Sequence, residues 1–383
     1  MSRASLRLGA QAIGLVTHAA PAVGGRSLTE GYLTQPLLAA HGEIAGGRLA
    51  FSGMLNGEAF TLRRGELNAG IYGEGYVDRR HPHTLLHELT ATVNGEVGGS
   101  RWSLTGGKGF APFGTDDPMV RPFAKYPVNH HLAQILERGV AIAAVRRGTL
   151  MVEAGLFNGD EPGSPEDVVN WRRFGDSWAV RGTALPRPGV ELSASYAAVA
   201  SPEFPAGSGL DHRKWSAAAR WERPGGYALL EWARTDEFIG AEPTFRFPSV
   251  LGEASLEWRG FTGALRLERT VRPEEERTLD PFRSPRPHAD VHLLGATRWT
   301  LASAALSAPP LRGGPLRLRP FLEVSHARAK ETLGSLVWDP AEFYGSASQW
   351  GLSAGVRAEV GTMHRRMGRY GAALAGPGNG HSH

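Results

Sequence analysis

The sequence alternates between apolar and polar residues in many segments between Leu85 and Val360, each long enough to cross a membrane as a strand. The last of these segments has an apolar residue at every second position, at Trp350, Leu352, Ala354, Val356, Ala358 and Val360. Because successive side chains of a β-strand point to opposite faces, such a strand has one apolar face and one polar face. The pattern predicts strands whose two faces meet different surroundings.

The same alternation recurs at 214–222, 252–259 and 316–325, with charged residues on the polar face. Soluble β-sandwiches also alternate, but their strands are usually only about five or six residues long and turn the polar face outward. Long alternating strands with Trp and Tyr near their ends are typical of membrane-spanning barrels. We therefore predict an all-β fold, a transmembrane antiparallel up-and-down β-barrel.

Composition excludes two other classes of protein. The 383 residues contain no run of about eighteen apolar residues, which a transmembrane helix needs. The formal net charge is +4, but the arginines alternate with glutamates along strands instead of clustering with aromatic residues, so we expect no nucleic-acid partner. The 50 glycines and 26 prolines fall mostly between the alternating segments, where turns need them.

Fourteen segments follow the alternation, and an even number suits an antiparallel barrel, so we predict about 14 strands within a range of 12 to 16. These segments are 48–56, 85–97, 100–110, 138–147, 150–158, 177–185, 190–200, 214–222, 227–235, 250–259, 262–271, 290–306, 316–328 and 349–361. Tight turns such as 187–189 alternate with long connectors such as 159–176 and 236–249. Short turns on one rim and long loops on the other are the layout of bacterial outer-membrane barrels.

The N-terminal residues 1–22 resemble a weak secretory signal peptide. Arg3 and Arg7 precede a short apolar run, and small residues lead to a cleavage site near Ala22, although Gln11 interrupts the run. We assign 1–22 to this signal, 23–370 to a single outer-membrane β-barrel and 371–383 to a disordered C-terminal tail.

One long connector is a candidate for a constriction inside the barrel. The stretch Asp116–Glu137 contains three prolines and ends in a short predicted helix, which suits a rigid segment folded inward. A loop packed on the outer rim is the alternative. The residues that would form this constriction loop are Asp116, Asp117, Arg121, Lys125, His130 and His131.

The polar face of each strand would line the lumen and carries both signs of charge. The predicted pore-lining residues are Arg181, Lys214, Arg220, Glu222, Glu253, Glu257, Arg259, Arg266, Glu268, Arg317, Arg319, Glu323, Arg357 and Glu359. Opposite charges can pair across the wall and water screens the rest, so we expect no strong preference for either ion sign. This favours passive diffusion of small polar solutes; the alternative is a lumen filled by salt-bridged side chains.

Histidines supply the main candidates for other chemistry. His81, His83, His130 and His131 lie near Asp116 and Asp117 in the same two connectors, but their spacing matches no metal-ligand motif. The glycine-rich stretch 106–109 lacks the Ser or Thr and the helix of a phosphate-binding loop. We therefore predict no catalytic residues, no metal, no cofactor and no enzymatic activity.

Two short elements carry a resemblance to a known family. The stretch 107–114 (Gly-Lys-Gly-Phe-Ala-Pro-Phe-Gly) resembles the strand-to-loop element of bacterial porins of the phosphate-selective type, and 156–159 (Leu-Phe-Asn-Gly) is similar to another such element. The resemblance implies a porin-like barrel. The dense lumenal lysines that phosphate selectivity would imply are missing from this sequence.

Together these patterns predict a porin-like channel in the outer membrane, with outer-membrane lipid and small polar solutes as partners and a homotrimer as the candidate assembly. Two alternatives remain open. A secreted or periplasmic β-sheet protein that binds a ligand would bury its apolar faces between sheets. An outer-membrane barrel with a histidine site on its rim would bind a metal or act as an enzyme.

Overall fold

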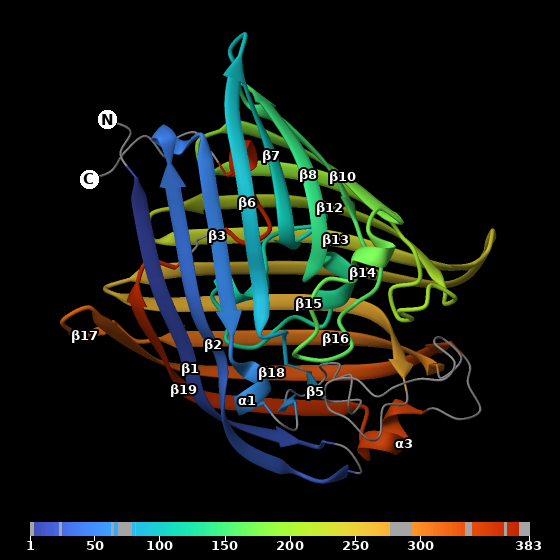
Figure 1. The fold of residues 1–383 in the computed structure, drawn as a ribbon. Helices are drawn as coiled ribbons and strands as arrows, with labels where there is room; N and C mark the ends of the chain where they lie inside the picture. Colours follow the sequence, from blue (N-terminus) through green and yellow to red (C-terminus); the bar gives the residue numbers. More distant parts are fainter. Residues whose placement is uncertain are drawn as a thin grey trace.

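The computed structural model describes residues 4–22, 25–62, 65–67, 79–80, 82–275, 293–333, 339–363 and 366–374. They form a closed antiparallel barrel of sixteen strands in which each strand pairs with its neighbours along the chain (Figure 1). The predicted all-β barrel is confirmed. The predicted number of about 14 strands is wrong by two, although 16 lies within the predicted range.

The wall strands are β1 (Ser5–Ala20), β2 (Leu28–Ile44), β3 (Leu49–Asn56), β6 (Leu86–Val97), β7 (Ser100–Gly109), β8 (Arg138–Arg147), β9 (Leu150–Phe157), β10 (Ser177–Arg187), β11 (Val190–Val199), β12 (Asp211–Arg223), β13 (Gly226–Ile239), β14 (Glu242–Trp258), β15 (Phe261–Glu275), β16 (Leu293–Ser307), β18 (Leu316–Leu333) and β19 (Ser348–Gly361). A short β17 (Leu311–Gly313) pairs with β18, and β4 (Glu66–Leu67) pairs with β5 (Arg79–Arg80). The helices are α1 (Glu58–Thr61), α2 (His130–Ala133), α3 (Pro340–Tyr344), and the 3-10 turns η2 (Ala45–Gly47), η3 (Pro118–Val120), η4 (Trp171–Arg173) and η5 (Gly371–Ala373). Within the described ranges, no helix is long and apolar enough to cross a membrane.

The first strand closes the barrel. β1 pairs with β2 on one side and with β19 on the other, in register from Gly9 opposite Gly361 to Ala20 opposite Trp350. The interpretation of residues 1–22 as a signal peptide therefore differs from the structure, which places most of this segment in the wall. Its short apolar run is one strand: Ile13 is buried inside, whereas the neighbouring Val16 is exposed outside.

The second strand was also missed, for a different reason. Its alternation is broken at Gln35, whose φ is +50°, and the register with β1 shifts at this point. Such a bulge puts two consecutive residues on the same face, so a strict two-residue pattern does not continue through it.

The two rims have the predicted connectors, with one exception. Tight turns at 98–99, 148–149, 188–189, 224–225 and 259–260 join strands at one end. The predicted long loop 236–249 does not exist, because β13 and β14 continue through these polar residues to a tight turn at 240–241. Its Asp, Glu and Arg residues indicated a loop, but here they belong to strand ends that remain paired.

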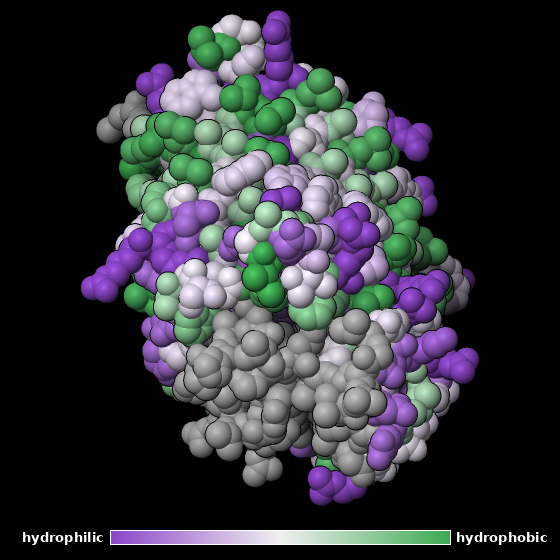
Figure 2. All heavy atoms as spheres, turned by 90° about the vertical axis from the view of Figure 1, so that its right-hand side faces the viewer, coloured by the Kyte–Doolittle hydropathy of each residue, from purple (hydrophilic) through white to green (hydrophobic). Residues whose placement is uncertain are grey.

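Along each strand, the alternate residues that are mainly apolar (the apolar parity) face outward, and the alternate residues that are mainly polar (the polar parity) face inward. On β14, Leu256 is 58% exposed on the outer surface while Glu253 is 3% exposed on the inner surface. β19 repeats this, with Trp350 and Leu352 exposed outside and Ser353 buried inside. This is the reverse of a soluble protein, and an apolar outer band of this kind suits contact with lipid. Figure 2 shows the end that carries the long connectors, where hydrophilic and hydrophobic side chains are mixed.

This orientation predicts a difference between two arginine substitutions on neighbouring strands. Leu265 lies in the middle of the outward face of β15, and Ser255 lies inward on β14. We expect Leu265→Arg to destabilise the barrel by roughly 2 to 4 kcal/mol, the cost of a charge near the bilayer midplane, whereas Ser255→Arg stays hydrated. Urea unfolding in lipid vesicles measures both. Equal folding yields for the two variants would contradict the orientation of the wall.

Candidate functional site

The connector between β7 and β8, residues 110–137, lies inside the ring of strands and is called the inner loop below (Figure 1). Phe113, Phe123 and Tyr126 are almost fully buried within it. Gly114 adopts a φ of +69°, and a Cβ there would lie 1.7 Å from the carbonyl oxygen of Ala133. Only glycine fits this close approach, which lets the loop fold back on itself.

Carboxylates of the wall accept hydrogen bonds from the backbone of the inner loop. The Ala124 N–H donates to Glu323 Oε2 over 2.9 Å, and the Val128 N–H donates to Glu268 Oε2 over 2.8 Å. Both glutamates were predicted to line a pore. Here they hold the inner loop against the wall.

Cations of the wall donate to carbonyl groups of the same loop. Arg266 Nη1 lies 2.8 Å from the Lys125 carbonyl oxygen, and Lys214 Nζ lies 2.7 Å from that of His131. Because these donors and the glutamates lie on several strands, the inner loop is held at points around the inner surface of the wall.

Glu231 on β13 makes the densest set of contacts with the inner loop. It accepts hydrogen bonds from Thr115 Oγ1, from Asn129 Nδ2 at 2.7 Å and from Arg121 Nη2 at 3.5 Å. Burial by itself lowers the pKa of the Arg121 guanidinium, but Glu231 together with Tyr227, Glu253 and Asp117 raises this pKa above its ordinary value. Arg121 is therefore a permanent buried cation that depends chiefly on Glu231.

The chain enters the lumen a second time after its last strand. In this C-terminal segment, of which residues 362–363 and 366–374 are described, Arg366 Nε lies 2.5 Å from Asp116 Oδ2. Arg369 contacts Glu153 at 2.9 Å and Glu191 at 2.6 Å. The segment therefore joins wall strands to the inner loop.

The predicted tail 371–383 begins within this segment. Ala372 and Ala373 in η5 are buried, and the Ala372 N–H donates to Ser103 Oγ over 3.0 Å. The part that is described is thus packed inside the barrel, and residues 375–383 lie outside the described residues.

Asp116 connects the two inward segments. It pairs with Arg366 of the C-terminal segment and with Arg220 of β12. Burial alone would raise the pKa of the Asp116 carboxyl, but Arg366, Arg220 and Arg369 hold this pKa well below its ordinary value. The carboxylate is therefore ionised at neutral and mildly acidic pH.

The other predicted pore residues divide between the interior and the rim. Buried Arg181 pairs with Glu153 at 2.6 Å, and buried Arg266 pairs with Glu253 at 2.5 Å. Arg319 and Arg357 lie inward and partly buried, whereas Glu222, Glu257, Arg317 and Glu359 lie toward the short-turn rim. Arg259 is an exception, because it sits in the turn after β14 with its guanidinium 4.7 Å from the centre of the outward Trp258 ring. Its expected place in the lumen is wrong.

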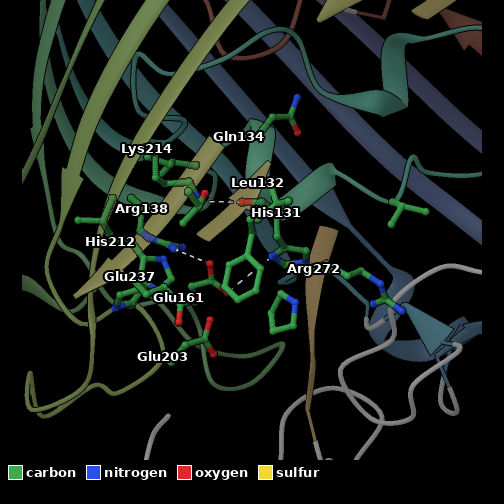
Figure 3. A pocket seen from close by; sticks show the side chains of 17 residues that line it. His131, Leu132, Gln134, Arg138, Glu161, Glu203, His212, Lys214, Glu237 and Arg272 are labelled. Atoms are coloured by element: carbon green, nitrogen blue, oxygen red, sulfur yellow. Dashed lines mark hydrogen bonds and ion pairs between the residues drawn. The ribbon is translucent and has the colours of Figure 1, made fainter. Parts of the chain in front are cut away.

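A pocket lies at the long-loop end, between the inner loop and the wall (Figure 3). Its charged lining is balanced: Arg138, Lys214 and Arg272 face Glu161, Glu203 and Glu237. His131, His212, Gln134 and Thr235 complete the polar part of the lining. In Figure 3 these side chains surround the same space at the long-loop end.

Sequence reasoning missed several of the residues that organise this interior. Glu231 shares the inward parity of β13 with Leu229 and Thr235, so the alternation could have found it. Arg366 and Arg369 follow the last strand, where no periodic pattern indicates that the chain turns back inside. Among the expected histidines, His81 lies outside the described residues, and His83 and His130 are buried.

No known protein family and no curated protein matches the sequence. Solved structures do match. The anion-selective porin from Comamonas acidovorans has a TM-score of 0.52 at 12% identity, with 93% of this chain and 100% of that chain covered. OmpT, an outer membrane protein of Vibrio cholerae in its trimer form, has a TM-score of 0.52 at 8% identity, with 94% of this chain and 99% of that chain covered. The chain has the fold of bacterial outer-membrane porins.

Removal of the Glu231 carboxylate should release the inner loop. We expect Glu231→Ala to destabilise the barrel by about 3 to 5 kcal/mol, because it leaves the buried Arg121 guanidinium without its carboxylate partner. The inner loop should also become cleavable in limited proteolysis. Glu257→Ala, on the exposed rim, is the matched control and should change neither measurement. An uncleaved loop in Glu231→Ala would show that other contacts suffice.

Proposed function

We propose that this protein is a porin-like channel of the outer membrane that lets small polar solutes diffuse passively. One observation carries the proposal: a wall that is apolar outside encloses a polar lumen, and a loop fixed by wall charges lies within that lumen. A soluble β-sheet protein would bury the apolar parity that is exposed here. The porin-like fold supports the same conclusion.

The inner loop is the proposed constriction, and the C-terminal segment narrows the lumen further. The two inward segments meet at the Asp116–Arg366 pair. Solutes would enter through the pocket at the long-loop end and pass the remaining space beside the inner loop. Small size and polarity are therefore the proposed criteria for passage.

Weak ion selectivity follows from the balance of charge. Three basic and three acidic side chains line the pocket, so neither sign of mobile ion gains a strong advantage there. Deeper charges neutralise one another in a network in which Arg181 and Arg369 pair with Glu153 and Glu191. No catalytic role is assigned to these groups, because their contacts serve to hold the inward segments.

A homotrimer is the proposed assembly. The OmpT structure of Vibrio cholerae, which shares the fold, is a trimer form. An apolar outer band gives every barrel a surface on which neighbouring copies can pack within the bilayer.

Replacement of Thr115–His130 by a short Gly-Ser linker tests the channel function directly. We expect single-channel conductance in planar lipid bilayers to rise, because the replacement removes the segment that crosses the lumen. The same replacement at 204–209, an exposed connector between β11 and β12, is the control and should leave conductance unchanged. A linker variant that folds but conducts no ions would contradict the proposal.

Release of the C-terminal segment should also raise conductance. Arg366→Ala combined with Arg369→Ala removes its contacts with Asp116 and Glu191, while Arg181 continues to pair with Glu153. The ordinary pKa of an aspartate carboxyl is about 3.9, and the pKa of Asp116 is lower than this. The ion pairs of Asp116 are therefore fully formed above about pH 3.9 and are lost only as the pH falls through the lowered pKa.

Wild-type conductance should therefore stay constant between about pH 7 and pH 5, as far as this pairing controls it. Planar-bilayer recordings at both pH values measure wild type and variant side by side. Equal conductance of the two proteins at pH 7 would show that the C-terminal segment does not narrow the channel.

A further inference from the structure

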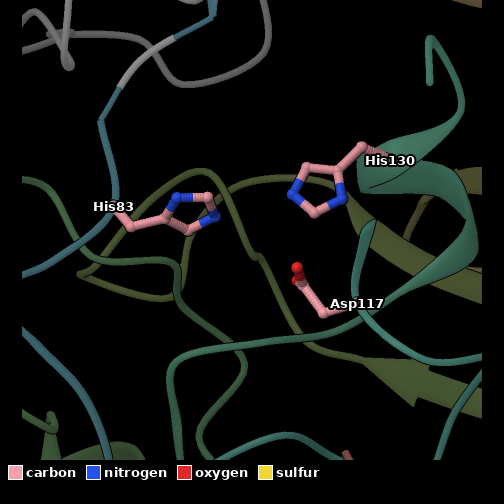
Figure 4. A group of neighbouring side chains, drawn as sticks. All are labelled: His83, Asp117 and His130. Carbon is pink, nitrogen blue, oxygen red and sulfur yellow. The ribbon is translucent and has the colours of Figure 1, made fainter. Parts of the chain in front are cut away.

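Two imidazoles and a carboxylate converge inside the barrel, apart from the channel pocket. His83 comes from the connector before β6, Asp117 precedes η3 and His130 begins α2. One ligand atom from each of the three lies within 4.8 Å of the others. Figure 4 shows the three side chains pointing toward one another across a shared space. From this arrangement we propose a binding site for one divalent transition-metal ion, with His83, Asp117 and His130 as its protein ligands.

The carboxylate of Asp117 points to a cation at this place. Its Oδ1 accepts a hydrogen bond from the Met119 N–H over 2.8 Å. Its Oδ2 is buried and accepts no hydrogen bond from any residue in the described part of the chain, and the residue as a whole is 0% exposed. A buried anionic oxygen without a donor is costly, and a metal ion would compensate it.

A second carboxylate orients His83. His83 Nδ1 lies 2.8 Å from Glu58 Oε2, so this nitrogen carries the proton and Nε2 presents its lone pair. Glu58 is itself buried and accepts hydrogen bonds from Thr34 Oγ1 and from the Gln35 N–H, each at 2.9 Å. A carboxylate behind a ligating histidine is a usual feature of metal sites, because it fixes the tautomer and raises the basicity of the ligand.

His130 is held in place from both sides. Its ring stacks on Tyr126 with centroids 4.8 Å apart, and it lies edge-on to His83 at 5.9 Å. The exposed fractions of His83 and His130 are only 2% and 5%, so water cannot easily replace a ligand. The three groups are therefore positioned before any ion binds.

The donor set selects the kind of metal. Two imidazole nitrogens and one carboxylate oxygen suit Zn²⁺ or another first-row divalent ion, and they leave one position for water. Ca²⁺ and Mg²⁺ prefer more oxygen ligands than this site offers. Sequence reasoning rejected a metal site because the ligands come from two separate connectors, so no local spacing reveals them.

A bound ion would tie the connector before β6 to the inner loop. His83 belongs to the first of these segments, and Asp117 and His130 belong to the second. The metal would thus hold the inner loop in place in addition to the hydrogen bonds from the wall. The binding itself does not depend on whether the barrel conducts.

The test uses the full chain, refolded in detergent, with His381→Ala and His383→Ala as background so that the terminal histidines cannot bind metal. Titration with Co²⁺, followed by visible absorption, and competition with Zn²⁺ give affinity and stoichiometry. We expect one equivalent of metal per chain in this background protein. Asp117→Asn should weaken binding at least roughly tenfold, and Glu58→Gln roughly 10- to 100-fold.

His131→Ala is the matched control, because His131 neighbours His130 on α2 but lies outside the three-residue group. It should bind metal as the background protein does. If Asp117→Asn does not fold, His130→Asn replaces it in the same comparison. Absence of bound metal in the folded background protein, or equal affinity in the folded ligand variants, would overturn the proposal.

Discussion

Every backbone N–H and C=O group in a wall that faces lipid must find its hydrogen-bond partner within the protein, and this requirement dominates the structure. The pairing of β1 with β19 meets it, because it leaves neither strand with an open edge. Closure also fixes the register of every strand, and with it the parity that faces outward. The apolar band, the inward charges and the space for two inward segments all follow from this closed wall.

Charges that face a closed lumen are costly unless they are paired, and this explains how the interior is built. The wall glutamates accept from loop amides, as Glu323 and Glu268 do, and the wall cations donate to loop carbonyls, as Arg266 does. Such contacts satisfy the wall charges and the loop backbone at the same time. Many of the charged residues that the sequence predicts to line a water-filled pore thus hold the inner loop instead.

The sequence was sufficient for the fold wherever strands alternate without interruption. β8 was predicted to the residue, because no bulge disturbs its pattern. Strand prediction failed at β2, where Gln35 breaks the alternation. It also failed at β1, whose small and apolar residues satisfy the criteria for a signal peptide as well. The candidate site was predicted only in part. The alternation along β15 shows that Glu268 points inward. Which atom of the inner loop it contacts depends on tertiary packing, which the alternation does not reveal.

Asp116 shows why the interior must be considered as one unit. It belongs to the inner loop, it pairs with Arg220 of the wall, and it pairs with Arg366 of the C-terminal segment. Because a buried carboxylate cannot lose its cations without a large desolvation cost, the position of each inward segment depends on the other. Displacement of the C-terminal segment would remove one of the cations that compensate the charge of Asp116. It would thereby weaken the attachment of the inner loop to the wall. The two inward segments are therefore coupled through a single carboxylate, although they come from parts of the chain that are far apart in sequence.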